Sequence, residues 1–95
     1  MNNYRLSNEA KNDLIQIHRY GARKFGMAQA DKYYESFFKY FEIIAQRPYS
    51  FESVDHIKEN YRRCVCGVDT IYFKVNREVV EIMAIVGRQD VNERL

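Results

Sequence analysis

The sequence contains no tryptophan, one proline, four glycines and two cysteines among its 95 residues. It also has no repeat, low-complexity tract or linker, so its composition is not that of a disordered protein. Because tryptophan is absent, the eight tyrosines and six phenylalanines must supply the aromatic part of the core. A chain of this length can bury one modest core, and we expect a single domain over residues 1–95.

The scarcity of cysteine excludes a disulfide framework. Cys64 and Cys66 are two positions apart on one face of a predicted strand, which is too close for an unstrained disulfide. A metal site would need further ligands, and no other cysteine or histidine stands near this pair in the sequence. We therefore expect two buried, reduced thiols, with no metal and no cofactor.

Long apolar runs are also missing. No segment approaches the roughly eighteen apolar residues that cross a bilayer, and residues 1–13 have no signal-peptide pattern. These features predict a cytoplasmic protein without a membrane span. The formal net charge of +2 is too small for binding dominated by nucleic-acid phosphates, so we expect no sequence-specific contact with nucleic acid.

Residues 61–90 are the most informative stretch, because they predict three consecutive short strands. Segments rich in Val, Ile, Tyr, Phe and Cys are separated there by two polar turns. Alternation gives the resulting sheet one apolar face, which includes Ile71 and Phe73 and which upstream elements must cover. The opposite face is expected to be open and to carry Arg63, Tyr72 and Lys74.

Two helices are predicted before these strands, at residues 8–25 and 28–46. Ser7 can cap the first helix and Gly26 can end it, while Pro48 ends the second. The first helix has an apolar stripe that runs from Ala10 to Phe25. Its other side is expected to face water, with Lys11, Asp13, Gln16, Arg19, Arg23 and Lys24.

Together with a short strand at residues 3–6, these elements predict an α+β fold of two layers in the order β-α-α-β-β-β. The helical hairpin is expected to pack on one face of a small, mostly antiparallel sheet. Because a helical hairpin returns the chain to its starting end, we expect the first strand to run antiparallel to the second and fourth strands and parallel to the third.

The second helix carries more aromatic side chains than one buried face needs. Burying one Phe is worth about 1.5–3 kcal/mol, so leaving several exposed would waste stability. Two interpretations are open: the first helix shields the surplus, or the surplus meets a partner chain at a groove beside the hairpin. The residues of this candidate partner surface are Leu14, His18, Tyr34, Phe38 and Phe41.

Basic side chains gather in the last strands and the tail: Arg62, Arg63, Lys74 and Arg88, together with Tyr72. Such a set can hold a phosphate backbone during RNA cleavage, or it can form a solvated basic rim. Acid–base catalysis at neutral pH favours a histidine or a tuned glutamate. Neither histidine falls in these strands, and Glu81 has no carboxylate neighbour, so we expect no catalytic residue.

Several short motifs resemble the RelE/ParE superfamily of toxins from type II toxin–antitoxin systems. They are IIAQRP at residues 43–48, YRR at 61–63, Tyr72 in the middle strand and IVGRQD at 85–90. The resemblance covers nearly the whole chain and includes the order of helices and strands. In this superfamily, RelE-like members are strongly basic, ribosome-dependent endoribonucleases, whereas ParE-like members act on DNA gyrase.

The mild charge, the strands without histidine and the tail without a terminal aromatic residue favour the ParE branch. The resemblance implies a toxin that inhibits gyrase by direct binding and that a small antitoxin neutralises at the candidate partner surface, within a complex able to form higher oligomers. The alternatives are a RelE-type endoribonuclease and a toxin-fold interaction domain without toxicity. The residues expected to contact the target are Arg62, Arg63, Tyr72, Arg88 and Asp90.

Overall fold

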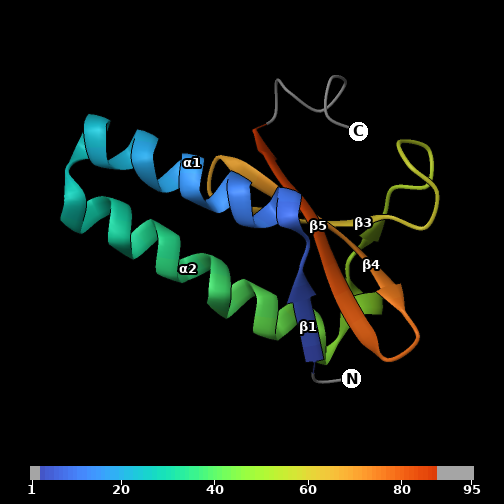
Figure 1. Cartoon of the computed structure of the whole chain (residues 1–95). Helices are drawn as coiled ribbons and strands as arrows, with labels where there is room; N and C mark the ends of the chain where they lie inside the picture. Colours follow the sequence, from blue (N-terminus) through green and yellow to red (C-terminus); the bar gives the residue numbers. More distant parts are fainter. Residues whose placement is uncertain (1–2, 88–95) are drawn as a thin grey trace.

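The structure is a computed structural model, and it describes residues 3–87. Two helices form one layer and five strands form the other, so the predicted two-layer α+β fold is confirmed (Figure 1). The elements are β1 (Asn3–Leu6), α1 (Asn8–Phe25), α2 (Met27–Gln46), the 3-10 helix η1 (Pro48–Ser50), β2 (Glu52–Ser53), β3 (Arg62–Cys66), β4 (Asp69–Asn76) and β5 (Val79–Gly87).

The sheet has the strand order β1-β5-β4-β3-β2, and only the β1–β5 pair is parallel. The predicted direction of β1 is wrong, because β1 runs parallel to β3 and β5 and antiparallel to β4. The cause is β2, a strand of two residues that shows no periodic pattern. β2 is the first strand after the hairpin and runs antiparallel to β1, which reverses every later strand relative to the prediction.

Short-range signals set the helix ends, as predicted. The Ser7 side chain accepts a hydrogen bond from the Ala10 N–H at 3.0 Å and so caps α1. Gly26 has a φ of +92° and is the single residue between the two helices. A backbone with positive φ favours glycine, and here it lets one residue reverse the chain.

The main core lies between the helices and the apolar face of the sheet. Cys64 and Cys66 of β3 are part of it, so the prediction of two buried, unpaired thiols is confirmed. The largest side chains that are fully buried in this core are Phe37, Phe41, Ile44, Ile71, Phe73 and Ile82.

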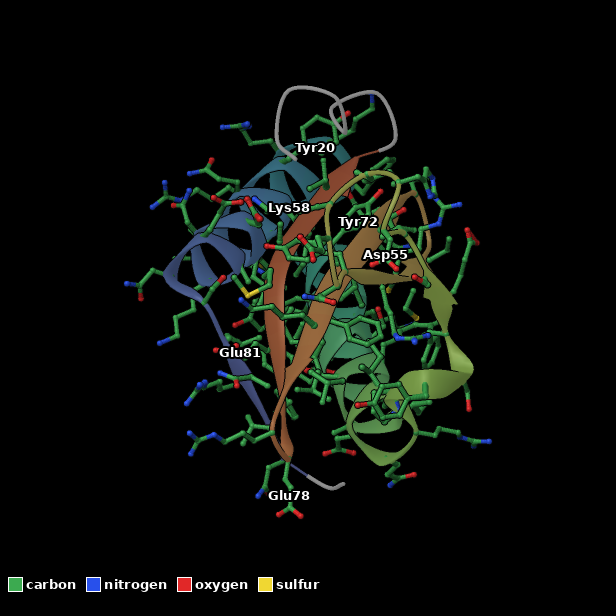
Figure 2. All side chains as sticks on the ribbon, turned by 90° about the vertical axis from the view of Figure 1, so that its right-hand side faces the viewer. Tyr20, Asp55, Lys58, Tyr72, Glu78 and Glu81 are labelled. Atoms are coloured by element: carbon green, nitrogen blue, oxygen red, sulfur yellow. The ribbon has the colours of Figure 1, made fainter. Side chains whose placement is uncertain are left out.

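The second face of the sheet is covered by the connector, which we define as residues 54–61. Its two ends are joined by a hydrogen bond from the Val54 N–H to the Tyr61 carbonyl at 2.8 Å. Val54 and Tyr61 pack with Tyr72 and Val86 in a second, smaller core. The prediction of an open face is therefore wrong at Tyr72, which is 1% exposed. Figure 2 shows the connector crossing in front of the strands at Tyr72.

Asp13 was expected in water on α1, and this prediction is wrong, because the residue is 7% exposed. Its Oδ2 accepts a hydrogen bond from the Ile85 N–H at 3.0 Å. β1 pairs with β5 only as far as Ile82, so the rest of that edge of β5 needs other partners. Asp13 supplies one, and the Ser7 hydroxyl supplies another by donating to the Met83 carbonyl at 2.9 Å.

We predict that Asp13→Ala lowers the free energy of unfolding by about 1–3 kcal/mol, because it leaves a buried backbone N–H without an acceptor. Asp13→Asn keeps an oxygen at the same position and should cost less. Asn12→Ala, a change at the exposed neighbouring position, is the control and should stay within about 0.5 kcal/mol of the parent. Urea unfolding measures all three, and an equal loss for Asp13→Ala and Asn12→Ala would contradict this role.

The cysteines generate a second prediction. Burial, with a smaller contribution from the neighbouring Cys66, raises the pKa of the Cys64 thiol to about 11. At pH 8 only about one such thiol in a thousand is ionised, so reaction with Ellman's reagent should be slow until the protein unfolds. Changing both cysteines to alanine should keep the fold and cost about 1–2 kcal/mol.

Val65→Ala is the control for this change, because Val65 lies between the two cysteines but is 56% exposed. It should alter the unfolding free energy much less than the double change. Fast labelling of the folded protein at pH 8 would show that the thiols are accessible and that this part of the core opens readily.

Candidate functional site

A continuous row of aromatic rings runs along the seam between α1, α2 and β1. Adjacent ring centroids lie 5.2–5.5 Å apart, which is the usual spacing of favourable aromatic pairs. We call the set the aromatic row; its members, in spatial order, are His18, Tyr34, Phe38, Phe41 and Tyr4. Four of the five predicted partner-surface residues therefore come together.

The members of the aromatic row differ in exposure. Phe41 is fully buried, while His18, Tyr34 and Phe38 are half-buried at the surface. Leu14, the fifth predicted residue, is 2% exposed and belongs to the main core. The first helix therefore shields the surplus aromatics only in part, because α1 covers one side of the row and leaves the other side at the surface. The contact of that exposed side with a partner chain stays a prediction.

A hydrogen bond across the helical hairpin fixes one end of the aromatic row. His18 Nε2 of α1 lies 2.7 Å from Asp31 Oδ1 of α2. The His18 ring also meets the Tyr34 ring edge to face. Asp31 was not singled out in the sequence, because its role depends on how two helices face each other. The consequence is a polar boundary beside an apolar strip.

A groove of about 1080 Å³ lies between the outer part of the hairpin, the β3–β4 turn and the end of β5. Tyr20, Phe25 and Val68 line it and are 52%, 63% and 81% exposed. Phe25 was expected on the buried stripe, and this is wrong because the hairpin extends past the sheet (Figure 1). The residues that line the groove come from segments far apart in the chain, so no local sequence pattern could show that they lie together.

The wall of this groove is held in place by Tyr33. Its hydroxyl lies 2.8 Å from Asp69 Oδ2 and 2.9 Å from the Cys66 carbonyl, so its single proton is shared between these two acceptors. Burial and the Asp69 carboxylate raise the Tyr33 pKa, so the phenol stays protonated as a donor. Gly67 has a φ of +62°, and a Cβ there would lie 2.7 Å from the Tyr33 ring. Only glycine fits this turn against the helix.

Arg62 and Arg63 point to opposite faces of the sheet, as consecutive strand residues must. Arg63 Nη2 lies 2.7 Å from Glu52 Oε2 of β2, and this hydrogen bond raises the Arg63 pKa. Arg62 Nη1 donates to the Phe51 carbonyl at 2.8 Å, and its guanidinium lies 5.1 Å from the centre of the Tyr49 ring. The two arginines are fixed, but they form no common patch.

The predicted target surface is therefore divided by the structure. Arg62 and Arg63 lie at the surface on different faces, while Tyr72 is buried under the connector. Arg88 and Asp90 lie outside the described residues. The sequence placed these side chains near one another along the chain, but strand alternation and the connector separate the three that the structure describes.

Glu81, the glutamate considered for acid–base chemistry, forms an ion pair with Arg5. Arg5 Nη2 of β1 lies 2.9 Å from Glu81 Oε2. This hydrogen bond, with help from Lys74, holds the Glu81 pKa below its usual value. A carboxylate of this kind stays ionised at neutral pH and is poorly suited to donate a proton. Figure 2 places Glu81 on β5, away from the connector.

Within residues 3–87, no group of three or more His, Cys, Asp or Glu side chains is arranged to hold a metal ion. In the same range, neither helix combines the length and apolar character needed to cross a bilayer.

Comparison with known proteins gives consistent results. The family model described as the ParE toxin of the type II toxin–antitoxin system parDE matches residues 4–91. Toxin ParE1 of Caulobacter vibrioides is 33% identical over 94 residues, which cover 99% of this chain and 96% of that protein. A solved structure of a chromosomal ParDE TA system from P. aeruginosa has the same fold, with a TM-score of 0.81 and 16% identity over 92% of this chain and 96% of that one.

These matches span almost the whole chain and agree with the arrangement of two helices on a five-stranded sheet. The protein belongs to the ParE family of toxins from type II toxin–antitoxin systems.

Proposed function

We propose that this ParE-type toxin arrests growth by binding DNA gyrase directly and that a cognate antitoxin neutralises it by occupying the helical side. The observation that carries the proposal is the match of the ParE family model to residues 4–91. Gyrase inhibition is the activity that the resemblance to the ParE branch implies. The proposal places the protein in the cytoplasm, where gyrase acts on the chromosome.

The arrangement of the surface supports two separate partner sites. The aromatic row offers a half-buried apolar strip on the helical side, which suits an amphipathic antitoxin segment. Arg62 and Arg63 lie at the surface of β3, and their neighbours hold them in place. Arginines fixed in this way are common anchors of protein interfaces, because little side-chain freedom is lost on binding.

The surroundings of His18 and Glu81 favour binding over RNA cleavage. His18 is held in the hairpin by Asp31, and Glu81 is kept ionised by Arg5. Neither group offers a proton beside Arg62 or Arg63. A RelE-type endoribonuclease and a toxin-fold domain without toxicity are the alternatives that the following experiment separates.

We predict that Arg88→Ala, or truncation after Gly87, weakens gyrase inhibition while antitoxin binding survives. Losing an interface anchor costs about 2 kcal/mol, which weakens binding about thirtyfold. A supercoiling assay with purified gyrase measures the first effect, and calorimetry with the antitoxin measures the second. Arg23→Ala, a change at an exposed position of α1, is the control.

The same assays identify the alternatives. An endoribonuclease would stop translation in a purified system and leave supercoiling untouched, and a non-toxic domain would do neither. Full gyrase inhibition after the truncation would place the target contact elsewhere on the molecule.

We predict that Tyr34→Ala weakens antitoxin binding about tenfold, which corresponds to about 1.4 kcal/mol, without reducing gyrase inhibition. Tyr34 and Phe38 both pack beside the main core, so a truncation to alanine is a better probe of the aromatic row than a charge at Phe38, which would destabilise the fold. Tyr40→Ala is the matched control, since Tyr40 is a half-buried tyrosine of α2 outside the row. Equal effects of the two changes would exclude the row and make the groove at Tyr20 and Phe25 the next candidate.

A further inference from the structure

A notch lies at the edge of the sheet where β4 extends beyond the start of β3. β3 starts at Arg62, opposite Phe73, whereas β4 continues to Asn76. The last residues of β4 therefore extend past β3, and the connector closes the other side of the gap. The resulting hollow has a volume of about 430 Å³, which is enough to admit an acidic side chain or a chain end.

Arg62 is positioned at this notch before any ligand arrives. One guanidinium nitrogen donates to the Phe51 carbonyl at 2.8 Å, and the Tyr49 ring supports the group at 5.1 Å. The other donors of the guanidinium remain available, since arginine has five. Among the described residues, Arg63 is ion-paired with Glu52, but no ion pair includes Arg62.

The backbone of β4 adds a second donor. The Ile82 carbonyl of β5 accepts a hydrogen bond from the Ser7 N–H, so the backbone groups of Ile82 point away from β4. Phe73 of β4 lies opposite Ile82, and in an antiparallel pair its N–H and C=O therefore point away from β5, towards β3. Val75 is two residues further on and points the same way, but β3 has not yet begun there. The Val75 N–H therefore faces the notch, which Val75 lines.

The charges around the notch select the class of ligand. Lys74 lines it as a second cation, and Asp55 is the only acidic residue among the described lining residues. The Asp55 carboxylate already accepts the Asn60 N–H at 2.7 Å. The surroundings are mixed in charge, because Lys58 and Glu59 are both exposed on the connector and Glu52 is already paired with Arg63. Such a surface lacks the row of cations that a nucleic-acid backbone with many phosphates needs, whereas a single carboxylate of a protein needs only one or two.

We propose that this notch binds one carboxylate of a protein partner, held by the Arg62 guanidinium and the Val75 N–H. Arginine suits this ligand because its planar fork matches the two carboxylate oxygens. The carboxylate comes from an Asp or Glu side chain or from a chain end. The inference extends the proposed function, because Arg62 belongs to the expected target surface, but it can be tested without gyrase.

The test is an NMR titration of the ¹⁵N-labelled full chain with three capped tripeptides. Acetyl-Gly-Glu-Gly-amide carries a side-chain carboxylate, acetyl-Gly-Gly-Gly carries a terminal one, and acetyl-Gly-Gln-Gly-amide carries none. We expect saturable shifts of the Arg62 Nε–H and the Val75 N–H with at least one acidic peptide, and none with the glutamine peptide. Whichever acidic peptide binds more tightly identifies the source of the carboxylate.

Matched variants assign the response to the notch. Arg62→Gln should abolish it, whereas Arg23→Gln, the same change at an exposed position of α1, should leave it unchanged. Arg62→Lys keeps the charge but loses the fork, and it should weaken binding about fivefold even if the glutamine variant fails to fold. Melting curves of all three variants control for stability.

Three results would overturn the proposal: no saturable shift with either acidic peptide, an equal response to the glutamine peptide, or tighter binding of inorganic phosphate than of both acidic peptides. The outcome is independent of the gyrase assay. Peptide binding without gyrase inhibition would contradict the proposed function and leave the carboxylate site standing. Gyrase inhibition without peptide binding would do the reverse.

Discussion

The hydrogen bonds that Ser7 and Asp13 make with β5 join the helical layer to the sheet. β1 covers only the first part of that edge of β5, and the remaining backbone groups lie where the start of α1 excludes water. A buried backbone group without a hydrogen-bond partner lowers the free energy of unfolding by more than most single side-chain contacts raise it. The first turns of α1 must therefore lie against β5. This attachment fixes the position of the hairpin and, through it, the position of the main core.

The two faces of the sheet are then covered in different ways, and the candidate functional surfaces lie at the margins of the two coverings. The hairpin covers one face but extends past it, which creates the aromatic row along one seam and leaves Phe25 in an exposed groove. The connector covers the other face through Val54 and Tyr61, which pack on Tyr72 and bury it. The candidate binding surfaces therefore lie where one covering element ends and the sheet continues.

Local chemistry could be predicted where a residue acts through its nearest neighbours in the chain. The cap at Ser7, the reversal at Gly26 and the burial of the two cysteines follow from short-range rules, and the structure confirms them. The direction of β1 could not be predicted, because it depends on β2, whose two residues carry no periodicity. Asp13 was misplaced for a related reason, since its partner lies 72 positions away.

By itself, the sequence determined the bounds of β1 and of the two helices to within about one residue, the apolar face of the sheet and the family. These properties depend on spacings of two to four residues, which are visible along the chain. Only the tertiary structure decided which predicted site residues share a surface. It brought His18 and Tyr34 together across two helices, separated Arg62 from Arg63 and buried Tyr72, because exposure and proximity are set by packing between distant segments.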